Sequence, residues 1–269
     1  MMTSKRIVSL QNPLIKKVLQ LKHKGKERTR SGLFVLEGQR EFEMACKGGY
    51  QIETLFYFPE IMPETALAAL LKEYPVQPEI IELAKEVYQK LAYREKTEGI
   101  LAVARTRSHE LTDLSLHKNP LILVAEAPEK PGNIGALLRT ADAANVDAVL
   151  IANPKSDLYN PNIIRSSVGC VFTVPIAMAS STEIIGYLKR LEISIFAAAL
   201  TTDTVYTSID YKGPAAIVVG TEATGLSDEW LSQCTAKVII PMEGFIDSMN
   251  VSVSAAILIF EAKRQRAQP

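Results

Sequence analysis

The stretch LILVAEAPEKPGNIGALLRTADAANVDAVLIAN (121–153) decides the fold class of this chain. Within it, LILVAEA (121–127) and DAVLIAN (147–153) are nearly continuous apolar runs, which are typical of strands buried on both faces of a sheet. Between them, NIGALLRTADAAN (133–145) has the composition of a helix. A strand, a helix and a second strand predict two parallel strands joined by a right-handed crossover. The sequence therefore predicts an α/β fold.

The same alternation continues to the end of the chain. Further apolar runs that we interpret as strands lie at 170–177, 193–200, 215–220 and 237–241, and helical segments follow, the last at 251–266. Strands that alternate with helices predict a mostly parallel sheet. In such sheets, ligands bind at the loops beyond the carboxyl ends of the strands. We therefore expect the functional site at those loops.

The N-terminal part has a different organisation, with shorter segments of mixed helical and strand character. The polar, nonperiodic stretch RTRSHELTDLSLHKNP (105–120) separates it from the α/β part. We expect two domains, 1–107 and 118–269. Within the first, residues 1–30 are expected to form one or two short basic helices, and residues 31–107 a compact α+β body.

Charge is distributed unevenly, although the formal net charge of the chain is zero. Residues 1–40 contain ten Lys and Arg and only two acidic residues, Glu27 and Glu37. The rest of the chain therefore carries an acidic excess. A basic segment on an otherwise acidic protein is typical of an arm that contacts phosphates, although a solvated helix face would show the same composition.

Composition argues against several classes of protein. Cys46, Cys170 and Cys234 lie far apart, and the three histidines complete no metal-ligand pattern, so we expect no metal site. No apolar run approaches the roughly 20 residues that a membrane span needs, and the N-terminus does not have the pattern of a signal peptide. We expect a cytoplasmic protein in a reducing compartment.

Three loops that follow predicted strands are rich in glycine and small polar residues. They are EKPGNIGALLRTAD (129–142), VVGTEATGLSDEW (218–230) and IIPMEGFIDSMNVSVSAAI (239–257). Glycine lets the backbone approach a flat ligand closely, whereas Asn and Ser before a helix are also common N-caps. Each loop alone has an ordinary structural explanation. Their occurrence together, at successive strand ends, indicates one binding site.

These three motifs resemble those of the SpoU (TrmH-like) branch of the SPOUT superfamily of RNA 2′-O-ribose methyltransferases. The resemblance covers about the last 150 residues closely. EGQREFEMA (37–45) and TEGILAVA (97–104) are also similar to an RNA substrate-binding domain of the ribosomal L30e type. The resemblance implies a smaller α+β L30e-like N-terminal domain and a C-terminal domain whose parallel sheet ends in a deep trefoil knot. It further implies S-adenosylmethionine as the cofactor and a homodimer built on the C-terminal domain.

The resemblance also assigns site residues by position. The cofactor would contact Leu200, Gly220, Ile240, Met242 and Met249, and the polar catalytic positions would be Asn133, Arg139, Glu222, Ser248 and Asn250. The resemblance implies that Arg139 contacts the ribose 2′-hydroxyl, either as a base or as an orienting group. We favour orientation with stabilisation of charge, because a guanidinium keeps its proton in proteins. The candidates for phosphate contact are Lys16, Lys22, Lys24, Lys26, Arg28, Arg30, Arg40 and Arg165.

The expected function is methyl transfer from S-adenosylmethionine to a ribose 2′-hydroxyl in structured RNA. The N-terminal domain favours ribosomal RNA of the 23S type, and transfer RNA is the alternative substrate. Two other functions stay open at this point: methylation of a base nitrogen, and a noncatalytic role as an RNA-binding or ribosome-assembly protein.

Overall fold

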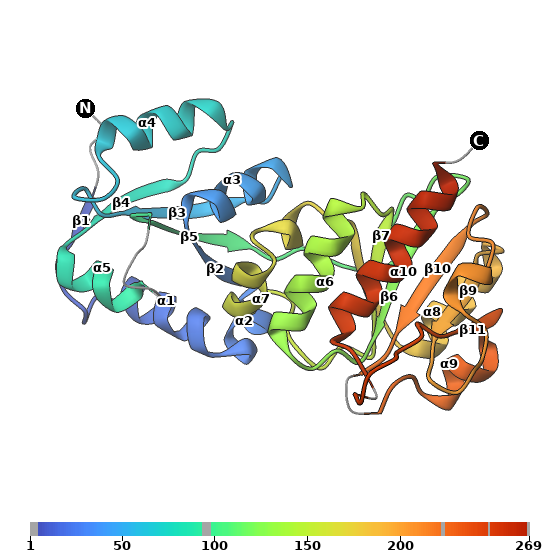
Figure 1. Ribbon diagram of the computed structural model, residues 1–269. Coiled ribbons are helices and arrows are strands. Elements are labelled where there is room, and N and C mark those ends of the chain that lie inside the picture. The colour runs from blue at the N-terminus through green and yellow to red at the C-terminus, as the bar shows by residue number, and fades with distance from the viewer. Residues whose placement is uncertain (1–4, 93–97, 222–223, 247, 268–269) are drawn as a thin grey trace. The chain divides into compact units, whose positions relative to one another are not determined.

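The computed structural model describes residues 5–92, 98–221, 224–246 and 248–267. The chain forms two compact units (Figure 1). The first contains the chain up to Arg107 together with residues 157–173, and the second contains residues 108–156 and the chain from Val174 onward. The sequence-based boundaries had assigned residues 157–173 to the C-terminal domain. Their side chains pack instead within the first unit, as described below.

The first unit is an α+β body. Its elements are β1 (Lys5–Ile7), α1 (Pro13–His23), α2 (Gly25–Ser31), β2 (Leu33–Glu37), α3 (Gln39–Lys47), β3 (Ile52–Tyr57), α4 (Glu64–Glu73), β4 (Glu79–Leu83), α5 (Lys85–Leu91), β5 (Ile100–Arg105), α7 (Pro161–Ser166) and the 3-10 helix η2 (Cys170–Phe172). The strand order is β1-β4-β3-β5-β2. Strands β1, β4 and β3 are parallel, whereas β5 runs antiparallel to both its neighbours.

One face of this sheet is covered by α1 and α5. Ile15, Val18 and Leu21 of α1 and Val87 of α5 are fully buried against Ile81 of β4 and its neighbours. Asn12 caps α1, because its side-chain oxygen accepts from the amide of Leu14 at 2.9 Å. The expected basic helices are therefore present, but the arm begins with strand β1, which the sequence did not predict.

Residues 157–173 complete the core of the first unit. The ring of Tyr159 stacks on Phe34 with centroids 4.5 Å apart, and Phe172 stacks on the same ring at 5.5 Å. The hydroxyl of Tyr159 accepts from the amide of Arg107 at 2.9 Å. A Cβ atom on Gly48 would lie 2.1 Å from the carbonyl oxygen of Phe172, so only glycine fits this contact.

The second unit is a six-stranded sheet with the order β11-β9-β10-β6-β7-β8, in which every pairing is parallel. The α/β class and the mostly parallel sheet predicted from the sequence are thereby confirmed. The elements are η1 (Leu111–Asp113), β6 (Leu121–Glu126), α6 (Pro131–Ala143), β7 (Ala148–Ala152), β8 (Ile176–Ala179), α8 (Ser181–Arg190), β9 (Ser194–Ala198), η3 (Tyr206–Ser208), β10 (Ala215–Val219), α9 (Asp228–Gln233), β11 (Ala236–Val238) and α10 (Val251–Arg266).

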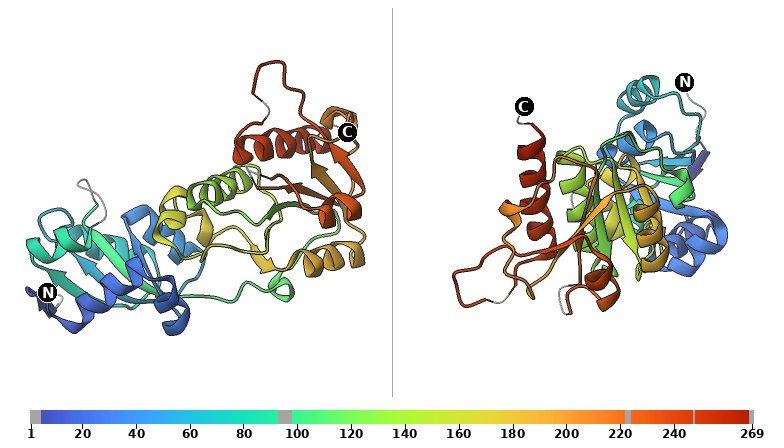
Figure 2. Two further views of the ribbon diagram at one scale, coloured as in Figure 1. Left: turned by 90° about the horizontal axis from the view of Figure 1, so that it is seen from below. Right: turned by 90° about the vertical axis from the view of Figure 1, so that its right-hand side faces the viewer.

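Helices cover both faces of this sheet. Figures 1 and 2 show α6 and α10 side by side on one face and α8 and α9 on the other. The central strands β6, β7 and β10 are buried along their whole length, which explains their continuous apolar runs. The core under α8 and α9 includes Ile184, Leu188 and Trp230, all of which are fully buried.

Strand order reverses between β6 and β10. From β6 the chain adds β7 and β8 on one side, and then returns to build β9, β10 and β11 on the other. The crevice outside the carboxyl ends of two such strands is where parallel α/β sheets bind their ligands. The loops that follow β6, β9, β10 and β11 gather at this edge, so the fold positions the site there.

Candidate active site

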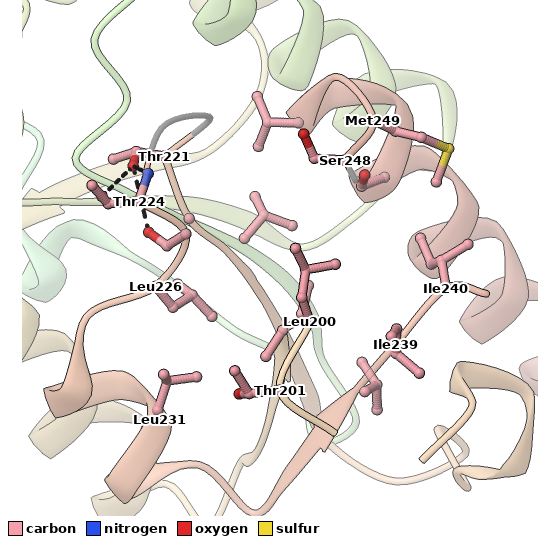
Figure 3. Close-up of a pocket in the computed structure, with 18 of the residues that line it drawn as sticks. Leu200, Thr201, Thr221, Thr224, Leu226, Leu231, Ile239, Ile240, Ser248 and Met249 are labelled. Atoms are coloured by element: carbon pink, nitrogen blue, oxygen red, sulfur yellow. Dashed lines mark hydrogen bonds between the residues drawn. The ribbon is translucent and has the colours of Figure 1, made fainter. Parts of the chain in front are cut away.

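The loops after β9, β10 and β11 enclose a cavity of about 370 Å³ together with the start of α10. This volume lies in the usual range for sites that hold small molecules. Figure 3 shows Leu200 and Thr201 opposite Leu226 and Leu231, with Ile239 and Ile240 along one side and Ser248 and Met249 at one end. The lining consists of Ala198, Ala199, Leu200, Thr201, Val219, Gly220, Thr221, Thr224, Gly225, Leu226, Leu231, Val238, Ile239, Ile240, Met242, Ser248, Met249, Val251 and Ser254.

A tight turn after β10 forms one wall of this cavity. The amide of Thr221 donates to the carbonyl of Gly225, and the reverse bond also forms, both at 3.1 Å. A Cβ atom on Gly220 would lie only 2.3 Å from the carbonyl carbon of Gly225. Gly225 itself has a φ of +68°, which glycine adopts without strain. The glycines of this motif are therefore required by the shape of the turn.

A smaller cavity of about 190 Å³ adjoins the first. Both are lined by Gly220, Thr221, Thr224 and Val251, so the turn after β10 and the start of α10 separate them. The hydroxyl groups of Thr221 and Thr224 are hydrogen-bonded to each other at 2.8 Å in this shared wall (Figure 3). The smaller cavity is otherwise lined from β6, the loop after it and α6, by Ala125, Pro128, Glu129, Lys130, Asn133 and Leu137.

A hydrogen bond joins two of the predicted catalytic residues beside the smaller cavity. The Nδ2 of Asn250 donates to the Oδ1 of Asn133 at 3.2 Å. The Oδ1 of Asn250 accepts from the amide and the hydroxyl of Ser252, so the same side chain also caps α10. The side chain that caps α10 is therefore the same one that contacts Asn133.

The structure brings together all five residues predicted for cofactor contact, since Leu200, Gly220, Ile240, Met242 and Met249 all line the larger cavity. Ser248 lines it as well, and Asn133 lines the smaller one. Arg139 lies on α6 with its side chain exposed and lines neither of the two cavities. Glu222 lies outside the described residues.

Several lining residues were missed by sequence reasoning. Thr201 and Leu231 belong to no motif, and Ser254 stands in the helical end of the third motif, where it was not singled out. These residues reach the cavity because β9, α9 and α10 pack around it. Thr221 and Thr224 could have been found, because they stand inside the glycine-bearing turn that the sequence singled out. Loop residues that face a cavity have no periodicity from which to recognise them.

The walls of the larger cavity fit S-adenosylmethionine. Leucine, isoleucine and methionine side chains provide apolar surfaces for a flat base, and the hydroxyl groups of Thr201, Ser248 and Ser254 provide polar contacts. Gly220 contributes to the wall of this cavity as well. Among the described residues, no group of three or more His, Cys, Asp or Glu is arranged to hold a metal ion. The described part of the chain also contains no helix that is long and apolar enough to span a membrane.

The basic residues predicted for RNA contact differ in exposure. Lys16, Lys24, Lys26, Arg30 and Arg40 are exposed. Arg30 forms an ion pair with Glu27 at 2.6 Å on α2. Arg165 is half-buried on α7, where its Nη2 donates to Asn162 Oδ1 at 3.3 Å, and belongs to the segment 157–173 of the first unit.

Two of these predictions need correction. Arg28 is 4% exposed, pairs with Asp157 and donates to the carbonyl of Leu21 at 2.5 Å, so it stabilises the interior. Lys22 is half-buried, and its Nζ donates to the carbonyl of Leu91. Burial lowers the pKa of Lys22, an effect that Glu37 partly offsets. Neither residue is a surface cation for phosphate contact.

A parallel α/β sheet with two adjoining cavities at the carboxyl ends of its strands is typical of a ligand-binding domain. The SpoU rRNA Methylase family matches residues 120–260 of the chain, and an MRM3-like substrate binding domain matches residues 12–102. The chain therefore belongs to the SpoU rRNA methylase family. This membership confirms the predicted enzyme class, an S-adenosylmethionine-dependent RNA 2′-O-methyltransferase.

Three known proteins show how far the similarity extends. The chain is 29% identical over 249 residues to the 23S rRNA (uridine(2479)-2′-O)-methyltransferase of Streptomyces viridochromogenes, covering 89% of this chain and 85% of that protein. A crystal structure of an RNA 2′-O ribose methyltransferase is 38% identical, with a TM-score of 0.84 over 97% of this chain and 99% of the other. The AdoMet-bound rRNA methyltransferase from Sinorhizobium meliloti is 28% identical, with a TM-score of 0.87 over 97% and 98% of the two chains.

Proposed function

We propose that this protein transfers a methyl group to a ribose 2′-hydroxyl in large-subunit ribosomal RNA. One observation carries the proposal: a cavity suited to S-adenosylmethionine shares a wall with a second cavity beside Asn133 and Asn250. The Streptomyces viridochromogenes relative acts on 23S rRNA, which favours ribosomal RNA as the substrate here. The target nucleotide is then expected in the smaller cavity.

S-adenosylmethionine supplies, when bound, a methyl group made electrophilic by the positive sulfonium. The larger cavity would hold it through the apolar side chains of Leu200, Ile240, Met242 and Met249 and the backbone at Gly220. The remaining task of the protein is to align a hydroxyl group with that methyl. We therefore assign most of the catalytic effect to positioning.

The polar residues near the smaller cavity would orient the ribose. Asn133 and Asn250 hold each other, so each presents its remaining hydrogen-bonding groups in a fixed direction. Arg139 would approach the 2′-hydroxyl of bound RNA, orient it and stabilise negative charge on its oxygen. We assign Ser248 to holding the ribose, and Glu222 either to pairing with Arg139 or to holding the target nucleotide.

The first unit would recognise the RNA. Its similarity to a substrate binding domain and the exposed Lys16, Lys24 and Lys26 support this assignment. Structured RNA is bound largely through its backbone and its shape, which suits lysine side chains on a helical arm. We further propose that the body of this unit has an L30e-like fold.

Two further parts of the proposal concern the C-terminal domain. We infer a trefoil knot from the similarity of this domain to the SpoU rRNA Methylase family, whose resemblance implies it. We also infer a homodimer through this domain, because Phe245, Ile246, Val253 and Phe260 are exposed on α10 and the loop before it. Sedimentation equilibrium would measure the mass, and a monomer at micromolar concentration would contradict the dimer.

A cytoplasmic location, where free thiols persist, completes the proposal.

The decisive experiment identifies the product. The protein is incubated with S-adenosylmethionine carrying a labelled methyl group and with protein-free ribosomal RNA, which is then digested to nucleosides. Recovery of a 2′-O-methylated nucleoside supports the proposal, and a base-methylated nucleoside contradicts it. Calorimetry with S-adenosylmethionine is the accompanying test, since RNA binding without cofactor binding would indicate a noncatalytic protein. Parallel reactions with transfer RNA decide between the two kinds of substrate.

A further inference from the structure

A buried carboxylate lies at the end of β6, outside both cavities. Glu126 is the last residue of this strand and is 6% exposed. We propose that Glu126 is a positioning residue for the methyl donor, because it fixes the turn that separates the two cavities. The inference rests on the proposed function, since it assumes that the larger cavity holds S-adenosylmethionine.

Glu126 lies beside the start of this turn, at Gly220, and forms hydrogen bonds with its end, at Ser227. In the parallel pairing of β6 with β10, Ala125 stands opposite Val219, so the next residues along the two strands are Glu126 and Gly220. At the far end of the turn, the amide of Ser227 donates to Glu126 Oε2 at 2.8 Å, and the Ser227 hydroxyl donates to Oε1 at 2.7 Å. The carboxylate thus holds Ser227 close to the end of β6.

A second set of hydrogen bonds fixes the carboxylate itself. The hydroxyl of Ser181, at the start of α8, donates to Glu126 Oε1 at 3.3 Å. The same hydroxyl oxygen accepts from Trp230 Nε1 at 2.8 Å and from Asn153 Nδ2 at 2.9 Å. Asn153 Oδ1 accepts in turn from the amide of Ser181 at 3.2 Å. The network joins β6, β7, α8 and α9, and a buried polar network with satisfied partners is rigid.

The wall of the larger cavity is adjacent in sequence to this hydrogen-bond network. Leu226, which precedes Ser227, lines the larger cavity, and so does Leu231 on α9. Thr221 and Thr224, between Gly220 and Leu226, line both cavities. If Ser227 is released from the carboxylate, the turn loses its attachment at one end. The cofactor pocket should then lose affinity before the rest of the domain unfolds.

Two variants weaken the network to different extents. Glu126→Gln keeps one acceptor oxygen but places an amide donor where a hydroxyl now donates. Ser227→Ala removes only the hydroxyl bond and leaves the amide bond. Loss of one buried hydrogen bond to a charged group is expected to raise the KM for S-adenosylmethionine about tenfold. The same turn also lines the smaller cavity, so kcat at saturating cofactor should fall as well, but by a smaller factor than the rise in KM.

Gln265 provides the matched control. It is a buried polar residue of the same unit, and its side chain accepts from the amide of Tyr211 at 3.0 Å and donates to the carbonyl of Ile209 at 2.9 Å. It lines neither of the two cavities. Gln265→Ala should lower the melting temperature without a change in the KM for S-adenosylmethionine, as expected of a residue that only stabilises the fold.

The measurements are steady-state kinetics with varied S-adenosylmethionine, calorimetric affinity for the same compound and thermal unfolding. The inference is overturned if Glu126→Gln and Ser227→Ala lower the melting temperature as Gln265→Ala does but keep the wild-type KM. If Glu126→Gln does not fold, Ser227→Ala decides alone. A wild-type protein that fails to bind S-adenosylmethionine would instead contradict the proposed function, so the two failures are distinguishable.

Discussion

Asn250 donates from Nδ2 to Oδ1 of Asn133 at 3.2 Å, although the two residues are 117 positions apart. The bond joins the residue before α10 to the first turn of α6, and both helices lie on the same face of the sheet. The Oδ1 of Asn250 is used separately, because it caps α10 through Ser252. The two ends of one amide group therefore have different roles, which mutagenesis can separate.

Asn250→Asp should separate the cap from the site. A carboxylate still accepts from the Ser252 amide, so the free energy of unfolding should change by less than about 0.5 kcal/mol. The donor to Asn133 is lost, and the methyl-transfer rate should fall by at least about tenfold. Chemical denaturation and single-turnover kinetics measure the two effects. The comparison variant Asn250→Ala should show the same loss of rate, and its free energy of unfolding should also fall by about 1 kcal/mol because the cap is removed. Full activity in Asn250→Asp would show that the bond is dispensable.

Arg139→Ala should reduce methyl transfer by at least about 10²-fold, because a fixed cationic donor would be missing when charge develops on the ribose oxygen. Binding of S-adenosylmethionine should stay unchanged, since Arg139 does not line the larger cavity. Arg190→Ala on α8 is the control, because Arg190 is also an exposed arginine of the second unit. Near-normal turnover of Arg139→Ala would remove the proposed role.

Replacing Lys16, Lys24 and Lys26 together with alanine should weaken RNA binding and flatten its salt dependence. Each lost phosphate contact lowers the slope of log K against log salt by roughly 0.7 to 0.9, so the loss of three contacts should lower the slope by roughly 2.1 to 2.7. The control removes the same charge elsewhere in the first unit, by changing Lys72, Lys85 and Lys90, which are exposed on α4 and α5. Equal slopes for the two triple variants would rule out the arm as the binding surface.

Arg28→Ala should destabilise the first unit by about 3 kcal/mol, because it leaves Asp157 without its buried partner. Lys26→Ala, two residues away and exposed, should cost less than about 0.5 kcal/mol. Urea unfolding followed by far-UV circular dichroism would measure both changes in stability. Tryptophan fluorescence is unsuitable for the first unit, because the single tryptophan lies in the second unit. A small effect of Arg28→Ala would return this residue to the set of candidates for RNA contact.

Cys46 should react slowly with thiol reagents. Burial, with a smaller contribution from Glu43, raises the pKa of this thiol to about 11. The pKa is raised, so the reactive thiolate is scarce at pH 8, and alkylation should be roughly 10²-fold slower than for an unperturbed cysteine. Mass spectrometry after timed iodoacetamide labelling checks this. Glu43→Gln should raise the rate, whereas rapid labelling of the wild type would contradict the expected pKa.

Sequence reasoning predicted the parts of the fold whose cause is local. The apolar runs that became β6, β7 and β10 are buried on both faces, so composition alone identifies them. By contrast, β1 was missed, because it is three residues long and carries two charges. Its edge position is held by pairing with β4 and by ion pairs from Lys5 to Glu79 and from Arg6 to Glu82, and none of these partners is near it in sequence.

The apolar run at 170–177 was assigned wrongly for a similar reason. It was expected to form one strand, but residues 170–172 form a 3-10 helix and β8 begins at Ile176. Val171 and Phe172 are apolar because they are buried in the first unit. The composition of residues 170–172 correctly predicted that they are buried, but wrongly predicted that they form a strand. The partner of Arg28 was equally invisible, since Asp157 is 129 positions away.

For the candidate site, the five residues assigned by motif to the cofactor line the larger cavity, whereas lining residues contributed by packing were missed. Gly220 and Met249 belong to loops whose glycine and small polar residues stand out in the sequence. Leu231 and Ser254 lie on helical faces that resemble any other half-buried surface. Their contribution depends on how α9 and α10 are placed, which local pattern does not determine.

The chain passes between its two units after Arg107, after Ser156 and after Thr173. A fragment cut at the sequence-based boundary, 118–269, would therefore carry residues 157–173 without the partners that cover Leu158, Tyr159, Ile163 and Phe172. Exposed in water, these side chains would make such a truncated protein prone to aggregate. The catalytic half is consequently not a module that can be excised or exchanged at a single joint. Exchange of the recognition unit of this chain would have to preserve three junctions at once.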